Sequence, residues 1–203
     1  MDVDVSRRLQ AAATDLHQIS QGPYVEAVEQ AIDLLEETFR AGRSLLAFGN
    51  GGSSADAQHL CAELVGRFLI ERRALSAVAL TTNQALLTAW SNDYRFDDVF
   101  ARQIEGIGRT GDVAWGISTS GDSPNVVNGL RRARELGLRT VGLTGANGGN
   151  AAAHCDVLLA VPLEETPRVQ EVHLITCHAI CGALEQRLFG GGKGALGLEA
   201  RAL

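Results

Sequence analysis

The feature of this sequence that most constrains its fold is the alternation of short apolar runs with longer helical segments. The apolar runs contain no charged residue and lie at 44–48, 77–80, 113–117, 140–143 and 157–161. Such short, continuous runs are typical of strands that are buried on both faces of a parallel sheet. Helical segments are predicted between and after them, at 54–70, 84–91, 97–106, 124–136 and 167–188. Strands that alternate with helices predict an α/β fold with a parallel sheet and helices on both faces.

Two further helical segments precede the first strand. Apolar residues recur at helical spacing over 3–20 and again over 24–39, with a break at Gly22-Pro23 between them. A length of 203 residues fits one domain. We therefore predict a single domain over residues 1–190, which includes this N-terminal helical segment, and a glycine-rich, poorly ordered tail over 191–203.

Composition and charge exclude several classes of protein. Apolar residues make up 45% of the chain, which is too many for a disordered protein. The net charge of −6 argues against a general nucleic-acid-binding role. No apolar stretch approaches the roughly 18 residues of a membrane span, and the N-terminus lacks the apolar run of a signal sequence. We expect a cytoplasmic protein with no membrane or nucleic-acid partner.

The four cysteines, Cys61, Cys155, Cys177 and Cys181, form no CxxC pair, as expected of reduced and mostly buried thiols. Cys177 and Cys181 flank His178, so a metal site is one interpretation of this spacing. Cysteines in the core of a helix are the preferred interpretation.

Two polar loops follow predicted strands. They lie at the carboxyl ends of the strands, where such folds bind ligands. The first loop (residues 49–54, GNGGSS) is neither a dinucleotide fingerprint nor a P-loop. Its glycines and the helix that follows could bind an anion or a sugar hydroxyl, or they could form only a tight turn with a serine cap. The loop alone favours neither interpretation.

The second loop (residues 118–124, STSGDSP) gathers hydroxyl side chains at the start of a helix. Pro124 suits the first turn of that helix and Ser123 suits its N-cap. A cap needs one serine, whereas this loop has four hydroxyls, on Ser118, Thr119, Ser120 and Ser123. We therefore prefer a phosphate site, which hydroxyls, amides and the helix dipole can form without a lysine.

His59 and Glu63 are four residues apart on one helix face and could hold a divalent metal, although such a pair alone is more often a solvated surface pair. On the last helix, Gln170 and His178 are separated by about 12 Å along the axis, which is far for two ligands of one metal. Either both side chains extend, or different subunits contribute, or the helix begins after Gln170. The sequence leaves these alternatives open.

Several separated motifs carry a family resemblance: GNGGSSADAQHLCAEL, SNDYRFDDVF, GDVAWGISTSGDSPNVV, VGLTGANGG and PRVQEVHLITCHAI. Together they resemble the phosphoheptose isomerases, which are sugar isomerase (SIS) domain enzymes that act on sedoheptulose 7-phosphate. The resemblance covers about residues 5–190. It implies a five-stranded parallel sheet flanked by helices, a homotetramer assembled through the two leading helices, one zinc ion per subunit, and conversion to D-glycero-D-manno-heptose 7-phosphate for heptose precursor biosynthesis.

The resemblance also implies residue roles. Glu63 and His178 match the acid/base pair, and the zinc ligands match His59, Glu63, Gln170 and His178. The substrate-binding residues match Asn50, Gly51, Gly52, Glu63, Asn92, Asp93, Ser118, Thr119, Ser120, Ser123 and Gln170. Segment 73–91, which includes Arg73, and the glycine-rich C-terminus depart from the family pattern.

The alternative function is that of a non-catalytic SIS-domain protein, which binds the replication initiator or senses a sugar phosphate. The resemblance implies that such relatives lack the metal and acid/base set. Because this chain has His59, Glu63, Gln170 and His178, we favour the isomerase.

Overall fold

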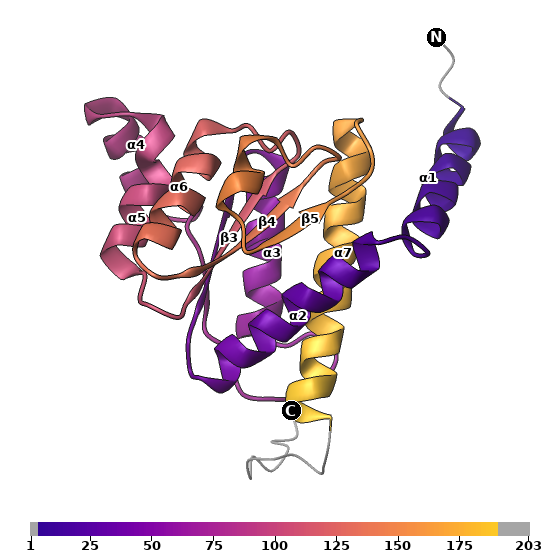
Figure 1. Ribbon diagram of the computed structural model, residues 1–203, viewed down its shortest axis with the longest axis horizontal. Helices are drawn as coiled ribbons and strands as arrows, with labels where there is room; N and C mark the ends of the chain where they lie inside the picture. The colour runs from indigo at the N-terminus through magenta and orange to yellow at the C-terminus, as the bar shows by residue number, and fades with distance from the viewer. Residues whose placement is uncertain (1–3, 191–203) are drawn as a thin grey trace.

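A computed structural model describes the structure of residues 4–190, so the predicted tail over 191–203 lies outside the described residues. The predicted five-stranded parallel sheet is confirmed, with strand order β2-β1-β3-β4-β5 (Figure 1). Its strands are β1 (Leu45–Gly49), β2 (Ala77–Ala79), β3 (Val113–Ser118), β4 (Arg139–Thr144) and β5 (Val157–Ala160). The order reverses between β1 and β3, and this switch point is where open sheets bind ligands.

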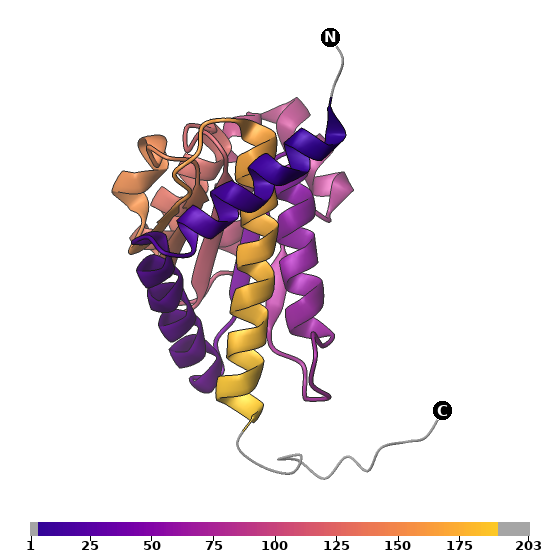
Figure 2. The ribbon, with the colours of Figure 1, turned by 90° about the vertical axis from the view of Figure 1, so that its right-hand side faces the viewer.

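Helices cover both faces of the sheet (Figures 1 and 2). One face packs against α2 (Tyr24–Arg40), α3 (Gly52–Val65) and α7 (Thr166–Phe189). The other face packs against α5 (Val99–Ile107) and α6 (Pro124–Glu135), with α4 (Gln84–Asp93) beside them. Helix α1 (Val5–Ile19) lies outside α7, away from the sheet (Figure 2). Short 3-10 turns lie at η1 (Phe96–Asp98) and η2 (Gly149–His154).

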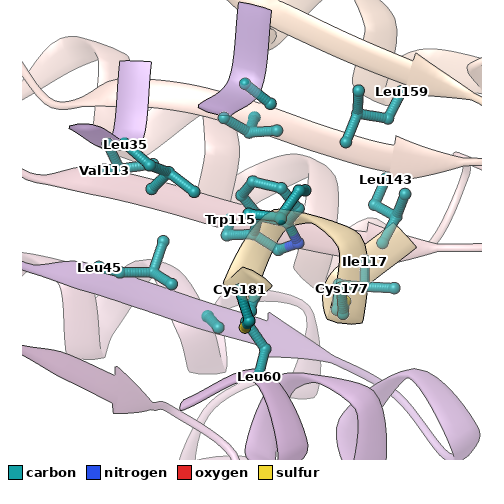
Figure 3. Close-up of a cluster of buried hydrophobic side chains, with 14 of the residues drawn as sticks. Leu35, Leu45, Leu60, Val113, Trp115, Ile117, Leu143, Leu159, Cys177 and Cys181 are labelled. Atoms are coloured by element: carbon teal, nitrogen blue, oxygen red, sulfur yellow. The ribbon is translucent and has the colours of Figure 1, made fainter. Parts of the chain in front are cut away.

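Alternate residues of the central strands supply the two halves of the core. Trp115 of β3 points toward α3 and α7, among Leu60, Cys177 and Cys181 (Figure 3). Its neighbour Ala114 faces α6 in the other cluster. Burial raises the pKa of the Cys181 thiol to about 12. All four thiols are unpaired, and those of Cys61, Cys177 and Cys181 are buried whereas that of Cys155 is half-buried, which confirms the predicted mostly buried thiols and the helix-core positions of Cys177 and Cys181.

The prediction that all five strands are buried on both faces is wrong for β2. This strand lies at the edge of the sheet and pairs only with β1, so Val78 remains 43% exposed. Among the described helices, none combines the length and apolar composition needed to cross a bilayer.

The helix predicted over 54–70 is present, but it begins and ends earlier than predicted: α3 begins at Gly52 and ends at Val65. A buried ion pair ends it. Arg72 donates to the carbonyl oxygens of Glu63 (2.7 Å) and Leu64 (2.8 Å), which are free at a helix end. The Glu185 carboxylate of α7 accepts hydrogen bonds from Arg72 and from the backbone N–H groups of residues 68–70. These groups hold the chain in a loop where the sequence pattern continues as a helix.

Candidate active site

The first loop is formed by close backbone approaches at glycines. A Cβ atom on Gly49 would lie 2.8 Å from the carbonyl oxygens of Ile117 and Ser53, so only glycine fits between β3 and α3. Gly51 has a φ of +55°, in the region that favours glycine. A Cβ atom on Gly52 would lie 2.5 Å from Nε2 of Gln170. The structure therefore brings Gln170 to Gly52 in the loop that also contains the predicted substrate residues Asn50 and Gly51.

The second loop holds its hydroxyl groups close together. Ser118 Oγ donates to Ser123 Oγ at 3.0 Å and lies 3.5 Å from Ser120 Oγ. Ser123 occupies the N-cap position of α6, and Pro124 follows it as predicted, but the Ser123 side chain makes no capping hydrogen bond. Its hydroxyl is directed to Ser118 instead. The simple interpretation of a capping serine is therefore wrong for Ser123, and the gathered hydroxyls suit an anion at the start of α6.

A neighbouring loop supports the second loop from behind. Asp122 accepts a hydrogen bond from the backbone of Asn150 at 2.8 Å, and Gly145 donates to the carbonyl oxygen of Thr119 at 2.9 Å. Beneath them His173 is fully buried and hydrogen-bonds the carbonyl oxygen of Thr144 at 3.1 Å. Burial lowers the pKa of His173 to about 4, so the ring is neutral and donates from Nε2. Sequence reasoning gave His173 no role, and its position identifies it as support for this loop.

The predicted acid/base residues Glu63 and His178 lie on α3 and α7, which run side by side (Figure 2). The Nε2 atoms of His59 and His178 are 2.8 Å apart, and Glu63 Oε1 lies 3.6 Å from Nε2 of His59. The ring of Phe68 stacks on His178, with centroids 5.4 Å apart. His59 and Glu63 are therefore more than a solvated surface pair, because His178 completes a group of three with them. We call His59, Glu63 and His178 the helix-pair group.

Gln170 does not join the helix-pair group within one chain. Helix α7 begins at Thr166, so the alternative in which it begins after Gln170 is wrong. Gln170 lies against Gly52, whereas His59 is seven residues further along α3, about 10 Å along its axis. Two imidazoles and a carboxylate are suitable zinc donors, but across residues 4–190 no three His, Cys, Asp or Glu side chains are placed to hold a metal ion. Zinc therefore stays a prediction.

Asn92 and Asp93 are exposed at the end of α4, where the Asn92 side chain donates to Asp93 at 2.9 Å. Helix α4 lies on the opposite side of the sheet from α3 and α7 (Figure 1). The structure thus does not bring these two residues to the helix-pair group.

Sequence reasoning missed Asn125, which lies at the second position of α6. Its side chain forms two hydrogen bonds with Asn50 of the first loop, each 2.8 Å long. An asparagine directly after Ser-Pro at a helix start was the available signal.

Comparison with known proteins places this arrangement in a family. The family model of the SIS domain matches residues 10–145. The phosphoheptose isomerase of Crocosphaera subtropica is 50% identical over 92% of this chain and 93% of its own length. This chain belongs to the SIS-domain phosphoheptose isomerases. Another family member, from Geotalea daltonii, is 55% identical over 83% of this chain and 86% of its own. The structure of phosphoheptose isomerase GmhA from Neisseria gonorrhoeae aligns with a TM-score of 0.84 and 41% identity, over 90% of this chain and 97% of that one.

Proposed function

We propose that this chain is a phosphoheptose isomerase, which converts sedoheptulose 7-phosphate into D-glycero-D-manno-heptose 7-phosphate, a heptose precursor. The observation that carries the proposal is identity of 50% over nine-tenths of the chain to a relative of that name. Further support comes from the glycine-rich first loop, from the hydroxyl groups of the second loop and from the helix-pair group. The alternative of a non-catalytic SIS-domain protein gains no such support.

The substrate phosphate would bind at the second loop. The hydroxyls of Ser118, Thr119, Ser120 and Ser123 and the N-terminus of α6 supply donors there. The first loop and Gln170 would contact the sugar hydroxyls. Binding energy from the phosphate, which does not react, would hold the sugar in place for the reaction.

Isomerisation moves one proton between carbons and another between oxygens. The Glu63 carboxylate would remove the proton from C1 of the ketose and return it to C2. His178 would carry the proton from the C1 hydroxyl to the C2 oxygen, so that C1 becomes the aldehyde and C2 the alcohol. General acid–base catalysis of this kind contributes about 10²–10⁴-fold.

A bound zinc ion would polarise the substrate carbonyl as a Lewis acid. The residues that would hold it are His59, His178 and Glu63, whose imidazoles and carboxylate are suitable zinc donors. The proposed fourth ligand is Gln170, which would have to come from an extended side chain or from another subunit.

We also propose a homotetramer in the cytoplasm. Apolar side chains are exposed on α1 at Val5 and Leu9 and on α7 at Leu174 and Ile175. A second copy packed on these helices would bury them and would enclose the helix-pair group. The free, buried cysteines suit a reducing compartment.

A turnover assay tests the proposed function. Purified protein should convert sedoheptulose 7-phosphate into an aldoheptose 7-phosphate, and zinc should restore the activity that a chelator removes. Conversion that survives complete metal removal would keep the isomerase and reject the zinc. An absence of conversion by the zinc-loaded protein would contradict the proposed function.

A further inference from the structure

The two loops are brought together by a close approach between α6 and β1. Phe48 lies in β1 and Asn50 directly follows its last residue, and both side chains meet α6, Phe48 at Gly129 and Asn50 at Asn125. Asn125 and Gly129 are four residues apart on α6 and share one helix face. A Cβ atom on Gly129 would lie 2.8 Å from the Phe48 ring. Glycine at this position therefore lets the start of α6 reach the end of β1.

At that point the two side-chain amides form a reciprocal pair. Asn50 Nδ2 donates to Asn125 Oδ1 at 2.8 Å, and Asn125 Nδ2 donates to Asn50 Oδ1 at 2.8 Å. Asn125 is only 2% exposed, so water cannot easily replace its partner. The two residues are 75 positions apart in the chain. The pair is the direct side-chain link between the first loop and the start of the second loop's helix.

The pairing fixes how Asn50 presents itself to a ligand. A side-chain amide has two N–H donors and an oxygen with two lone pairs. The pair with Asn125 uses one donor and one lone pair, which leaves Asn50 one N–H and one lone pair for substrate. A rotation of the Asn50 amide by 180° would break both hydrogen bonds and exchange the two ends.

We infer that Asn125 is a positioning residue, which orients the Asn50 amide and holds the sugar-binding first loop in register with the phosphate-binding second loop. This inference rests on the proposed function for the identity of the substrate. The physical link itself depends only on the two amides.

Substitution of Asn125 by aspartate gives a specific test. A protonated carboxyl group has the donor and acceptor of an amide and can restore both hydrogen bonds. An ionised carboxylate accepts from Asn50 Nδ2 but faces Asn50 Oδ1 without a proton to share. Burial raises the pKa of a carboxyl group, so this change should fall within a usable pH range.

We expect Asn125→Ala to lower kcat/KM for sedoheptulose 7-phosphate about tenfold, because it leaves the Asn50 amide unpaired. Asn125→Asp should show a similar loss at pH 8, and its activity relative to the wild type at the same pH should rise as the pH falls toward 5.5. Asn128→Ala is the matched control, since Asn128 is on the same helix and bonds to residues 97 and 98, outside the loops. Melting temperatures at each pH would show that every variant is folded during the assay.

A binding measurement, which we call the binding arm of the test, separates this inference from the proposed function. Calorimetry of sedoheptulose 7-phosphate needs no turnover, and the dissociation constant should rise about tenfold in Asn125→Ala. If the wild type binds but does not convert the sugar phosphate, the proposed function fails and the binding arm still tests the link. Wild-type affinity in Asn125→Ala, or an Asn125→Asp to wild-type ratio that is flat with pH, would overturn the inference.

Discussion

The first and second loops, at the carboxyl ends of β1 and β3, and the helix-pair group are built in different ways. The loops are held by backbone geometry, by glycines that permit close approach, and by hydrogen bonds such as the Asn50–Asn125 pair. His59 and Glu63 lie on one surface of α3, with side chains 40% and 23% exposed, and His59 contacts His178 of the neighbouring helix α7. The difference suggests a division of tasks, in which the loops bind the sugar phosphate and the helix-pair group carries out proton transfer.

After the loss of the base Glu63, His178→Gln gives the largest expected effect, because glutamine keeps a polar group there and cannot exchange a proton at neutral pH. The turnover number should fall about 10²–10⁴-fold, while the dissociation constant for the sugar phosphate stays within a few-fold of the wild type. Steady-state kinetics and calorimetry measure the two quantities, with zinc content determined in the same samples. If His178→Gln lost affinity for the sugar phosphate and kept its turnover number, His178 would have a role in binding and not in proton transfer, which would contradict the proposed division of tasks.

His173 should make the support of the second loop sensitive to acid. Burial lowers its pKa to about 4 from 6.5, so below pH 6.5 the unfolded chain binds a proton that the folded protein does not. The free energy of unfolding should therefore fall as the pH drops from 6.5 to about 4, by about 3 kcal/mol from this group.

Urea unfolding at pH 7 and pH 4 measures this contribution. His173→Gln keeps a donor for the Thr144 carbonyl but removes the titration, so the difference between the two pH values should shrink by the same amount. His17→Gln, at an exposed histidine of α1, is the control and should leave the difference unchanged. An unchanged pH dependence in His173→Gln would show that this ring is not the acid-sensitive group.

Ser123→Ala gives the smallest expected effect and tests the second loop alone. It removes one proposed phosphate donor and the partner of the Ser118 hydroxyl, so KM should rise about fivefold with the turnover number unchanged. Ser76→Ala is a matched control, because it breaks a similar serine pair, 2.8 Å long, with Ser44 at the other end of β1. Equal KM values in Ser123→Ala and Ser76→Ala would contradict the assignment of the second loop as the phosphate site.

The sequence predicted what depends on local pattern. The strands, the helices and both loops could be predicted because apolar runs, glycines and caps act within a few residues. The end of α3 could not, because Glu185 acts from 117 residues away to hold the N–H group of Phe68. The role of Asn125 was missed for the same reason, since its partner Asn50 is distant in the chain. The positions of Gln170 and of Asn92 relative to the helix-pair group likewise depend on how helices pack.

Proton exchange at C1 of sedoheptulose 7-phosphate in D₂O, followed by NMR for the wild type and Glu63→Gln, tests the central claim most directly. The wild type should exchange the C1 proton for deuterium and form an aldoheptose 7-phosphate. Glu63→Gln should bind the sugar phosphate with nearly unchanged affinity, yet neither exchange the proton nor form product. Exchange at the wild-type rate in a folded Glu63→Gln variant would contradict the assignment of Glu63 as the base and, with it, the division between loops that bind and helices that react.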